Sequence, residues 1–575
     1  MNGAGRVGEA YRAGRREAVV FGAALLIRLA HVVATWNVAF VQRPVGDAAG
    51  YLAWAQRIAG GEWLGTEAFY QAPAYPYVLG ALFSVFGPEV AVVRAAQALW
   101  GAASAAVLCW AGGVLFGRRT AWAAGLMHAL YGPAVFFDGI VQKAALAGAL
   151  TCVVVAGVAA CTRSARYVAP TVVGGAAGLL ALTRENALAW LPVLLVFMVV
   201  ESRWRQGLRW RTVAWRAAAL GAGALLWLVA AGARNAAVTG EWSVSTFQFG
   251  PNLYIGNGAE ADGRYRPLVR GHETPEFERQ DATRLAEEAL GRELTAAEVS
   301  RYWAGRAWAE MRAAPGRSVR LLGLKALLTW NRYEVPDVEG LAVYAGQSAV
   351  LRGVSRVWHF GVVAPLAVGG IVLTRRRWRE LWVFYVLAAA LTGAVALFYV
   401  LARYRFPMVP ILVLFAAAGV GEAVDLVRQR RWKALSVTAG VVALVAVVVN
   451  WPVQDERRLE ALAQMNLGVV LAQRGELTEA TTWLQAAVRG CPGSAEAHFN
   501  LAQALMLAGR DEEAIAAYRE ALRWAPQVAE VHFFLAQALE RTGRTAEAVT
   551  HYRSVLRLAP DDAEALAAIH RLGPK

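Results

Sequence analysis

Acidic residues that could do chemistry first appear in the loop after the first apolar run. Asp47 stands in residues 44–51 (PVGDAAGY), and Glu62 and Glu67 follow in the same loop. A positioned carboxylate can take the proton from a hydroxyl group that attacks a substrate. An isolated aspartate at such a place is more often the cap of the following helix, expected here over 48–58. The catalytic interpretation of Asp47 therefore depends on which other groups reach the loop.

Cationic residues stand at or near the ends of later apolar runs. Arg403 and Arg405 lie in the phrase RYRFP, Arg184 lies in LTREN, and Lys143 precedes an alanine-rich run. The planar guanidinium group suits bidentate binding of a phosphate. An arginine at a membrane helix end can also simply extend its charge to the interface, and Arg184 can pair with Glu185. We expect Arg403 and Arg405 to bind a phosphate group, with Arg184 and Lys143 as further candidates.

These residues belong to an integral membrane protein. The chain has 575 residues, is 57% hydrophobic and has a mean hydropathy of +0.37. Only 18% of its residues are charged, against about 25% in soluble domains. The net charge of +15 comes from arginines at the ends of apolar runs, which is what membrane orientation requires, so we exclude nucleic acid as a partner. The four cysteines show no metal-ligand or disulfide spacing.

Apolar runs of about 20 residues, long enough to cross a bilayer, recur from residue 18 to 450. The first run is long and lacks a small-residue cleavage site, so it is predicted to be a membrane span and not a signal peptide. Spans are predicted near 18–38, 89–115, 120–136, 140–161, 167–182, 187–201, 213–233, 356–374, 381–402, 406–425 and 434–450.

Arginine clusters set the predicted orientation, because cytoplasmic loops are enriched in Lys and Arg. Arg6, Arg12, Arg15 and Arg16 place the N-terminus inside. The remaining clusters are at 118–119, 163–166, 203–211, 375–379 and 428–433. Eleven spans put all of them on the cytoplasmic side and leave the C-terminus outside. Residues 73–86 are apolar but short, and a crossing there would reverse every later cluster, so we predict a re-entrant or juxtamembrane helix.

The predicted fold is all-α: a polytopic membrane helical bundle of about 11 spans with an external loop domain and a C-terminal α-solenoid. The regions are an N-terminal transmembrane module over 1–233 with an external loop at 41–88, an external segment over 234–355, further spans over 356–450, and repeats over 451–575. Helices are predicted at 275–290 and 295–313, with an amphipathic piece at 317–330.

The tail repeats with a period of 34. Residues 461–494, 495–528 and 529–562 align without gaps, and 563–572 are predicted to form a capping helix. Four kinds of position fix the register: Leu467/Leu501/Leu535, Gly475/Gly509/Gly543, Ala480/Ala514/Ala548 and Pro492/Pro526/Pro560. This period and pattern are those of tetratricopeptide repeats. Such an array can merely stabilise the C-terminus, but it more often presents a groove to a protein or peptide partner, and we favour partner binding.

Several phrases occur together in a recognisable order. After Asp47 comes the aromatic and proline phrase YQAPAYPY at 70–77, which includes Tyr70 and Gln71. The later phrases are FDG with QK at 137–143, LTREN at 182–186, RN with VTGE at 234–241, NLYIGN at 252–257, WN with YE at 330–334, and RYRFP at 403–407. Over residues 18–425 this order resembles the GT-C membrane glycosyltransferases. The nearest members are the bacterial proteins similar to protein O-mannosyltransferases and the lipid A aminoarabinose transferases, of the glycosyltransferase family 39 type. Some of these relatives also carry a C-terminal tetratricopeptide array.

The resemblance implies transfer of a sugar from a polyprenyl-phosphate donor, with inversion, on the external face of a bacterial inner membrane. It implies Asp47 as the catalytic base. The family's loop often carries two clustered acids, and here the second acid is left open between Glu62, Glu67 and Asp138. Further pocket residues implied by the matching phrases are Tyr70, Gln71, Arg234, Tyr254 and Asn257. Arg28 resembles a recurrent family feature and can equally anchor a neighbouring loop.

Two other classes of function remain. The chain can be a non-catalytic scaffold whose repeats assemble an envelope complex, or a transporter. We rank the transporter last because the spans show no internal symmetry. A divalent ion bridging the acids and the phosphate is left open, since no ligand spacing establishes one. The expected partners are membrane lipid, the lipid-linked donor, and a protein or peptide bound by the repeats; the sugar and the acceptor do not follow from the sequence.

Overall fold

The structure is a computed structural model that describes residues 3–244, 246–269 and 275–573, without the side chains of 3–13 and 275–276. The side chains of Arg6 and Arg12, used above for the orientation, therefore lie outside the described part. All described secondary structure is helical, as predicted. Contacts divide the chain into two units, 1–36 with 44–335 and 344–453, and 37–43 with 336–343 and 454–575. We call them the membrane unit and the repeat unit.

Eight segments of the described chain are long and apolar enough to cross a membrane. They are Gly14–Ala34, Val90–Phe116, Ala144–Cys161, Glu185–Arg205, Trp210–Thr239, Ala349–Leu397, Ala402–Arg428 and Trp432–Val449. The segment Ala349–Leu397 contains two apolar helices, α18 (Phe360–Thr374) and α19 (Trp378–Leu397), separated by the arginine turn Arg375–Arg377. These segments show a multi-pass membrane protein, while the count of eleven spans stays a prediction.

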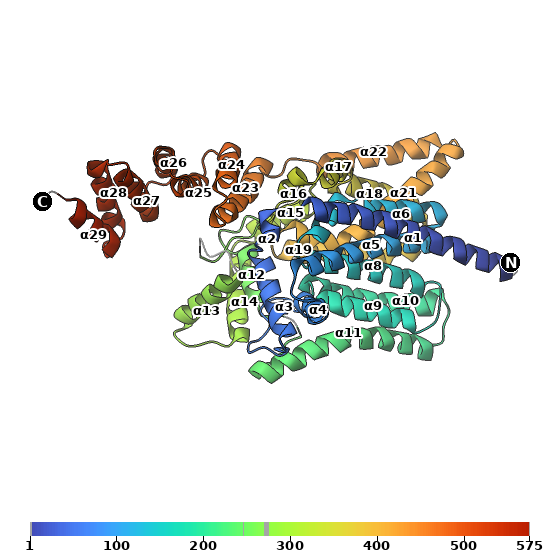
Figure 1. Ribbon diagram of the computed structural model, residues 1–575. Helices are drawn as coiled ribbons and strands as arrows, with labels where there is room; N and C mark the ends of the chain where they lie inside the picture. The colour runs from blue at the N-terminus through green and yellow to red at the C-terminus, as the bar shows by residue number, and fades with distance from the viewer. Residues whose placement is uncertain (1–2, 245, 270–274, 574–575) are drawn as a thin grey trace. The chain divides into compact units, whose positions relative to one another are not determined.

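Long helices of the N-terminal half lie side by side in the order α1 (Gly3–Ala34), α5 (Val90–Phe116), α8 (Ala144–Cys161), α9 (Val168–Ala181) and α11 (Trp210–Thr239) (Figure 1). Glycines allow the closest approach. A Cβ atom on Gly174 of α9 would lie 1.9 Å from the Leu220 carbonyl of α11, and one on Gly223 would lie 2.4 Å from the Thr171 carbonyl. Membrane helices associate without a hydrophobic driving force between them. Small residues let their backbones approach closely, so that van der Waals packing holds the helices together.

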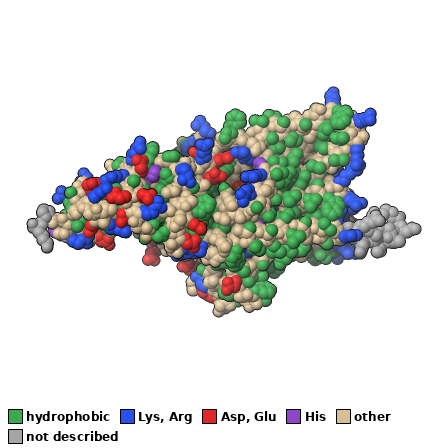
Figure 2. All heavy atoms as spheres, turned by 45° about the horizontal axis from the view of Figure 1, so that its top comes forward, with side chains coloured by type: hydrophobic (Ala, Val, Ile, Leu, Met, Phe, Trp, Pro, Cys, Tyr) green, Lys and Arg blue, Asp and Glu red, His purple; other side chains and the backbone are tan. Residues whose placement is uncertain are grey.

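Helices α21 (Val409–Arg428) and α22 (Trp432–Val449) pack with α18, and α10 (Trp190–Val200) packs with α11. The predicted span 120–136 is divided into α6 (Arg118–Ala129) and α7 (Gly132–Gly139). The new helix starts at Gly132-Pro133, and proline suits the first turn of a helix because its missing N–H has no partner there. On the face that Figure 2 shows, hydrophobic side chains gather over a broad area of the membrane unit, and Lys and Arg side chains line one edge of it.

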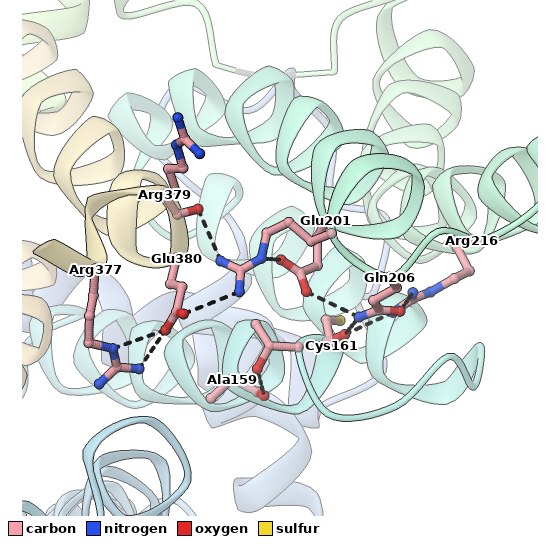
Figure 3. Close-up of polar contacts among 10 residues, drawn as sticks. Ala159, Cys161, Glu201, Gln206, Arg216, Arg377, Arg379 and Glu380 are labelled. Carbon is pink, nitrogen blue, oxygen red and sulfur yellow. Dashed lines mark hydrogen bonds and ion pairs between the residues drawn. The ribbon is translucent and has the colours of Figure 1, made fainter.

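The predicted cytoplasmic arginine clusters meet at one end of this bundle. Arg205 pairs with Glu201 at 3.2 Å and with Glu380 at 3.5 Å, and Glu380 also pairs with Arg377 at 2.6 Å (Figure 3). Arg216 donates to the Ser164 carbonyl at 3.0 Å. Two further contacts join the clusters at 118–119 and 163–166 to the same end: Arg119 with Asp425, and Arg163 with the Val114 carbonyl.

Helix α4 (Ala74–Phe86) begins and ends away from that arginine end. Its first N–H, of Ala74, donates to the carbonyl of Leu182, which follows α9, at 3.0 Å. Only three residues separate α4 from α5, and α5 then runs about 40 Å to Leu115, whose carbonyl accepts from Arg377 at 2.9 Å. This geometry agrees with the re-entrant or juxtamembrane helix on which the predicted orientation depends.

The segment predicted to be external, which we continue to call the external segment, is helical as well. It contains α12 (Phe249–Asn257), α13 (Pro275–Leu290), α14 (Ala296–Ala313), α15 (Pro315–Thr329), α16 (Leu341–Gln347) and α17 (Ala349–Val357). The predicted helices at 275–290, 295–313 and 317–330 correspond to α13, α14 and α15. Thr295 and Glu298 form a reciprocal capping box at the start of α14, which satisfies two backbone N–H groups of its first turn.

The repeat unit contains three helix pairs and a final helix: α23 (Glu456–Gln473) with α24 (Leu477–Gly490), α25 (Ala495–Leu507) with α26 (Asp511–Trp524), α27 (Ala529–Arg541) with α28 (Thr545–Leu558), and α29 (Ala563–Leu572). Gly475, Gly509 and Gly543 have φ of +78°, +73° and +77°, which only glycine adopts without strain. Two short segments join the first pair: Arg43 after α2 (Ala39–Gln42) donates to the Gln473 carbonyl at 3.2 Å, and Asn466 donates to the Val338 carbonyl at 3.4 Å.

Candidate active site

Asp47 is the first residue of α3 (Asp47–Ala59), but its carboxylate does not cap the helix. The N-cap residue is Gly46, with φ of +55°, and no side chain caps this end. The Asp47 carboxylate instead accepts from Gln71 Nε2 at 3.0 Å on Oδ1, and from Tyr51 Oη at 3.3 Å and Arg403 Nη1 at 2.5 Å on Oδ2. The helix-cap alternative for Asp47 is therefore wrong, since its oxygens serve tertiary contacts.

The charge of Asp47 is fixed by its neighbours. Its side chain is 12% exposed, and burial alone would raise the pKa of Asp47. The nearby positive charges of Arg403 and Lys143 and the Gln71 hydrogen bond outweigh burial and lower that pKa to about 2. Asp47 is therefore ionised at neutral pH.

Arg403 lies in a short helix that follows an extended stretch between two membrane helices. Residues 398–401 follow α19 and precede the short helix α20 (Ala402–Arg405). Val400 donates its N–H to the Gly263 carbonyl and Ala402 donates to the Val335 carbonyl, each at 3.0 Å. The external segment thus holds this stretch from both sides, and it positions Arg403 against a residue 356 positions earlier in the chain.

Arg184 and Lys143 line a cavity of about 260 Å³. Arg184 is 2% exposed and Lys143 is 5% exposed. The guanidinium of Arg184 lies over the Tyr404 ring, 5.0 Å from its centroid, and its Nε and Nη2 atoms have no hydrogen-bond partner among the described residues. The described ion pairs do not include Arg184 with Glu185, whose carboxylate accepts from Thr246 at 2.8 Å. Two buried cations, one with donors unused, suit an anionic ligand.

The rest of the cavity wall is largely apolar. It includes side chains from the 185–200 membrane segment, from α12 and from the end of α19: Leu188, Ala189, Phe249, Ala394, Leu397 and Phe398. Polar lining residues besides the cations are Glu185, Asn186, Thr246, Gln248, Asn252, Tyr399 and Tyr404. A cavity lined by two cations and by apolar membrane residues fits an amphipathic ligand that has an anionic head.

Arg405 does not share this site, contrary to our expectation that it binds a phosphate. It is 2% exposed and pairs with Glu334 at 2.8 Å. Its guanidinium also donates to the carbonyls of Thr329 at 3.2 Å, Tyr333 at 3.2 Å and Asn331. Its guanidinium also lies over the Phe360 ring, 3.9 Å from the centroid. Because its hydrogen bonds and its ion pair all go to the 329–335 loop, Arg405 fixes that loop in place.

The three candidate second acids are also engaged elsewhere. The Asp138 carboxylate accepts from Arg28 Nε at 2.7 Å inside the helix bundle, and both side chains are nearly unexposed. A Cβ atom on Gly101 would lie 1.9 Å from Asp138, so α5 needs glycine to make room for this pair. Glu67 pairs with Arg279 and is 62% exposed. Glu62 lies 3.9 Å from Arg57 at an exposed position. No described hydrogen bond or ion pair joins any of the three to Asp47.

The remaining predicted pocket residues divide between the site and its supports. Gln71 contacts Asp47, and Tyr70 donates to Glu278 at 2.9 Å. Arg234 lies over the Phe69 ring and donates to the Glu67 carbonyl at 2.5 Å, so it holds the first external loop. Asn257 is buried and accepts from Lys325 Nζ at 2.9 Å. Tyr254 packs on Trp303, with ring centroids 4.8 Å apart. Asn257 and Tyr254 therefore support the external segment.

Glu278 is the site residue that sequence reasoning missed. It lies in the second turn of α13, and its carboxylate accepts from Tyr70 Oη at 2.9 Å and from Tyr265 Oη at 3.0 Å. Burial raises the pKa of Glu278, the two tyrosine hydrogen bonds oppose that rise, and the charges of Asp47 and Arg403 are close enough to contribute. No motif marks Glu278, because it stands in a charged stretch (PEFERQD) that is typical of a solvated helix.

The described residues around Asp47 include no set of three His, Cys, Asp or Glu ligands. Asp47 is paired with Arg403, and the described chain contains no group of three or more His, Cys, Asp or Glu side chains that could hold a metal ion. The divalent ion that the sequence leaves open therefore has no identified ligand set among the described residues.

Tetratricopeptide repeat family models match residues 443–495, 495–528 and 512–572. The tail is a tetratricopeptide array. This agrees with the 34-residue period, with the left-handed glycines between the paired helices, and with Ala480, Ala514 and Ala548, which are completely buried. No curated protein matches the chain in sequence.

The solved structures to which the chain is similar include an oligosaccharyltransferase and an ArnT protein. The oligosaccharyltransferase of Archaeoglobus fulgidus in its apo form has a TM-score of 0.43 and 14% identity over 82% of this chain and 58% of that protein. ArnT from Cupriavidus metallidurans, bound to undecaprenyl phosphate, has a TM-score of 0.38 and 16% identity over 88% of this chain and 80% of that protein. The chain thus spans little more than half the length of the oligosaccharyltransferase.

Proposed function

We propose that the chain is a membrane glycosyltransferase that moves a sugar from a polyprenyl-phosphate carrier to an acceptor hydroxyl. The observation that carries the proposal is the cavity near Asp47, which Arg184, with unused N–H donors, lines together with Lys143 and with apolar membrane residues. A phosphate ester on a long apolar chain has both properties that this cavity selects. A soluble nucleotide-sugar would leave the apolar wall without a partner.

The cations supply what the leaving group needs. When the bond between the anomeric carbon and the phosphate oxygen breaks, the electron pair stays on the phosphate, and negative charge grows there. Arg184 and Lys143 are already in place and already desolvated, so they stabilise that charge without reorganising at the moment of reaction. Arg403 is 11% exposed and can divide its five donors between Asp47 and the phosphate.

The acceptor supplies the other half of the reaction. Its hydroxyl oxygen forms the new bond to the anomeric carbon, on the face opposite the departing phosphate, so the configuration inverts. Its proton passes to a carboxylate of the site. Asp47 is the carboxylate that the sequence predicts for this role. Whether or not it takes the proton, Asp47 keeps Arg403 in position through the 2.5 Å ion pair.

The membrane side follows from the charge bias. The arginine clusters that meet at one end of the bundle would face the cytoplasm. Asp47 and the cavity would then face the external side of a bacterial inner membrane. By the same count of spans, the tail with its repeats is external. The repeats then bind a protein or peptide, either the acceptor or an assembly partner.

The proposal is tested with the full chain in lipid nanodiscs. Sugar transfer is measured from a panel of synthetic polyprenyl-phosphate sugars to water and to membrane extracts, by mass spectrometry of the released lipid phosphate. Asp47→Asn should abolish release. Asp262→Asn, which breaks only an exposed pair with Arg266, should not. Purified wild-type chain that binds no polyprenyl phosphate and releases none from any donor would refute the proposal. Full cellular function of Asp47→Asn would instead favour the scaffold.

A further inference from the structure

We infer that Glu278, on the external helix α13, is the carboxylate that takes the proton from the acceptor hydroxyl, while Asp47 stays ionised as the partner of Arg403. This inference rests on the proposed function and deepens it. It changes the role that the sequence predicts for Asp47, and it assigns a role to a residue that no motif marks.

The contacts of the two carboxylates differ. Asp47 is bound by a guanidinium at 2.5 Å and by an amide and a hydroxyl on its remaining sides. Glu278 makes no ion pair within the described chain and accepts only the hydroxyls of Tyr70 and Tyr265. A carboxylate has about four lone-pair positions, so both oxygens of Glu278 keep room for a further hydroxyl donor. An entering hydroxyl can therefore reach Glu278 without displacing a positive charge.

A continuous set of contacts joins Glu278 to the rest of the site. Tyr70 is adjacent in sequence to Gln71, the amide donor to Asp47. On the other side, the Tyr265 ring lies 5.3 Å from the Tyr399 ring, and Tyr399 lines the cavity with Arg184 and Lys143. Glu278 thus lies between the Asp47 loop and the tyrosines of the cavity wall, where an acceptor would approach the donor sugar.

The electrostatic environments push the two acids in opposite directions. The pKa of Asp47 is lowered to about 2, which makes it a weak proton acceptor. The pKa of Glu278 is raised above its ordinary value by burial, which makes it a stronger one. The groups that act on Glu278 are its two hydrogen-bonded tyrosines, Asp47 and Arg403 from the site, and Tyr399 from the cavity wall. Arg279 and Asp281 are the neighbouring charged residues on its own helix. Two neighbouring acids with separated pKa values are a common arrangement for divided roles.

The step balances without a further reactant. The acceptor O–H bond breaks, and its proton goes to a carboxylate oxygen of Glu278. The acceptor oxygen bonds to the anomeric carbon as the carbon–oxygen bond to the phosphate breaks, and the phosphate keeps that electron pair. Glu278 returns its proton to solvent when the product leaves, because α13 lies in the external segment and the residue is only partly buried.

The test compares Glu278→Gln with Glu288→Gln in the full chain, using the donor that the wild-type chain accepts. Glu288 is on the same helix, exposed and paired only with Arg284. Glu278→Gln should lower kcat/KM by about 10²–10⁴-fold, the usual contribution of a general base, with wild-type affinity for undecaprenyl phosphate. Glu288→Gln should match the wild type. Glu278→Asp should recover part of the activity.

The pH profile separates a proton acceptor from a structural acid. For wild type, kcat/KM should fall as the pH drops through the raised pKa of Glu278. In Tyr265→Phe the carboxylate loses a hydrogen bond that lowers its pKa, so this fall should move to higher pH. If Glu278→Gln keeps wild-type kcat/KM, or if Tyr265→Phe leaves the acid limb where it was, the inference is wrong. Transfer by the wild-type chain would stand in that case, so failure here is distinct from failure of the proposed function.

Discussion

Replacing Arg184 with methionine separates ligand binding from folding more sharply than any other change in this chain. Arg184 is buried, its Nε and Nη2 atoms have no partner among the described residues, and its ring contact is with Tyr404 at 5.0 Å. A buried donor without a partner costs about 1–3 kcal/mol, and a desolvated cation–π contact returns up to about 2 kcal/mol. Methionine fills a similar volume without the charge. We therefore expect Arg184→Met to be at least as stable as wild type without ligand.

Binding should change in the opposite sense. A hydrogen bond from a charged group contributes about 1.5–3 kcal/mol, so the variant should bind undecaprenyl phosphate about tenfold to 150-fold more weakly. At a ligand concentration 100 times the wild-type Kd, binding stabilises the wild type by about 2.7 kcal/mol. A variant with 50-fold weaker binding would gain only about 0.6 kcal/mol at the same concentration.

The assay is thermal unfolding of the full chain in detergent, followed by tryptophan fluorescence, with and without undecaprenyl phosphate. Arg266→Met, which removes an exposed arginine paired with Asp262, is the control and should show the full wild-type shift. A lower melting temperature for Arg184→Met without ligand, together with an unchanged ligand-induced shift, would show that Arg184 is structural and that the phosphate binds elsewhere.

Three further outcomes follow from the packing. Asp138→Asn leaves the buried Arg28 charge unpaired and should destabilise the chain by about 3–5 kcal/mol, whereas Arg28→Met with Asp138→Asn should recover much of that loss, as measured by melting temperature. Gly174→Leu should force α9 away from α11, because a Cβ atom at residue 174 would lie 1.9 Å from the Leu220 carbonyl. Monodisperse protein should then be lost in size-exclusion chromatography. Gly14→Ala, where nothing lies within 4 Å of the added Cβ atom, should have no effect. A maleimide should add one label per folded chain, at Cys491, because the other three cysteines are buried; labelling of more than one would contradict the packing.

Local patterns predicted the elements well. The period of 34 residues placed the helix pairs of the tail because each repeat carries its own glycine, alanine and proline positions. The helices α13 and α14 were predicted from short amphipathic stretches. The span predicted at 120–136 was wrong as one helix, because the hydropathy of the run hides the break before Pro133.

The site was predicted only in part. Asp47, Gln71, Arg403, Arg184 and Lys143 are the residues that the fold brings to one region. Arg405 was expected beside Arg403, but residues two positions apart in a short helical turn point in different directions, and Arg405 turns to the 329–335 loop. Asp138 was one candidate for the second acid, but its carboxylate instead forms a buried ion pair with Arg28.

The sequence by itself determined that the protein is a multi-pass helical membrane protein with a tetratricopeptide tail, since hydropathy and repeat period are local properties of the chain. Tertiary structure decided which charged side chains pair with one another and which remain available to a ligand. Asp47 and Arg403 form an ion pair although they are 356 residues apart in the sequence. Glu278 and Tyr70 form a hydrogen bond although they are 208 residues apart. Whether a buried cation has a partner depends on the folded neighbours that desolvate and pair it. That is why Arg184 with unused donors, and Glu278 without a counter-ion, emerge only from the fold.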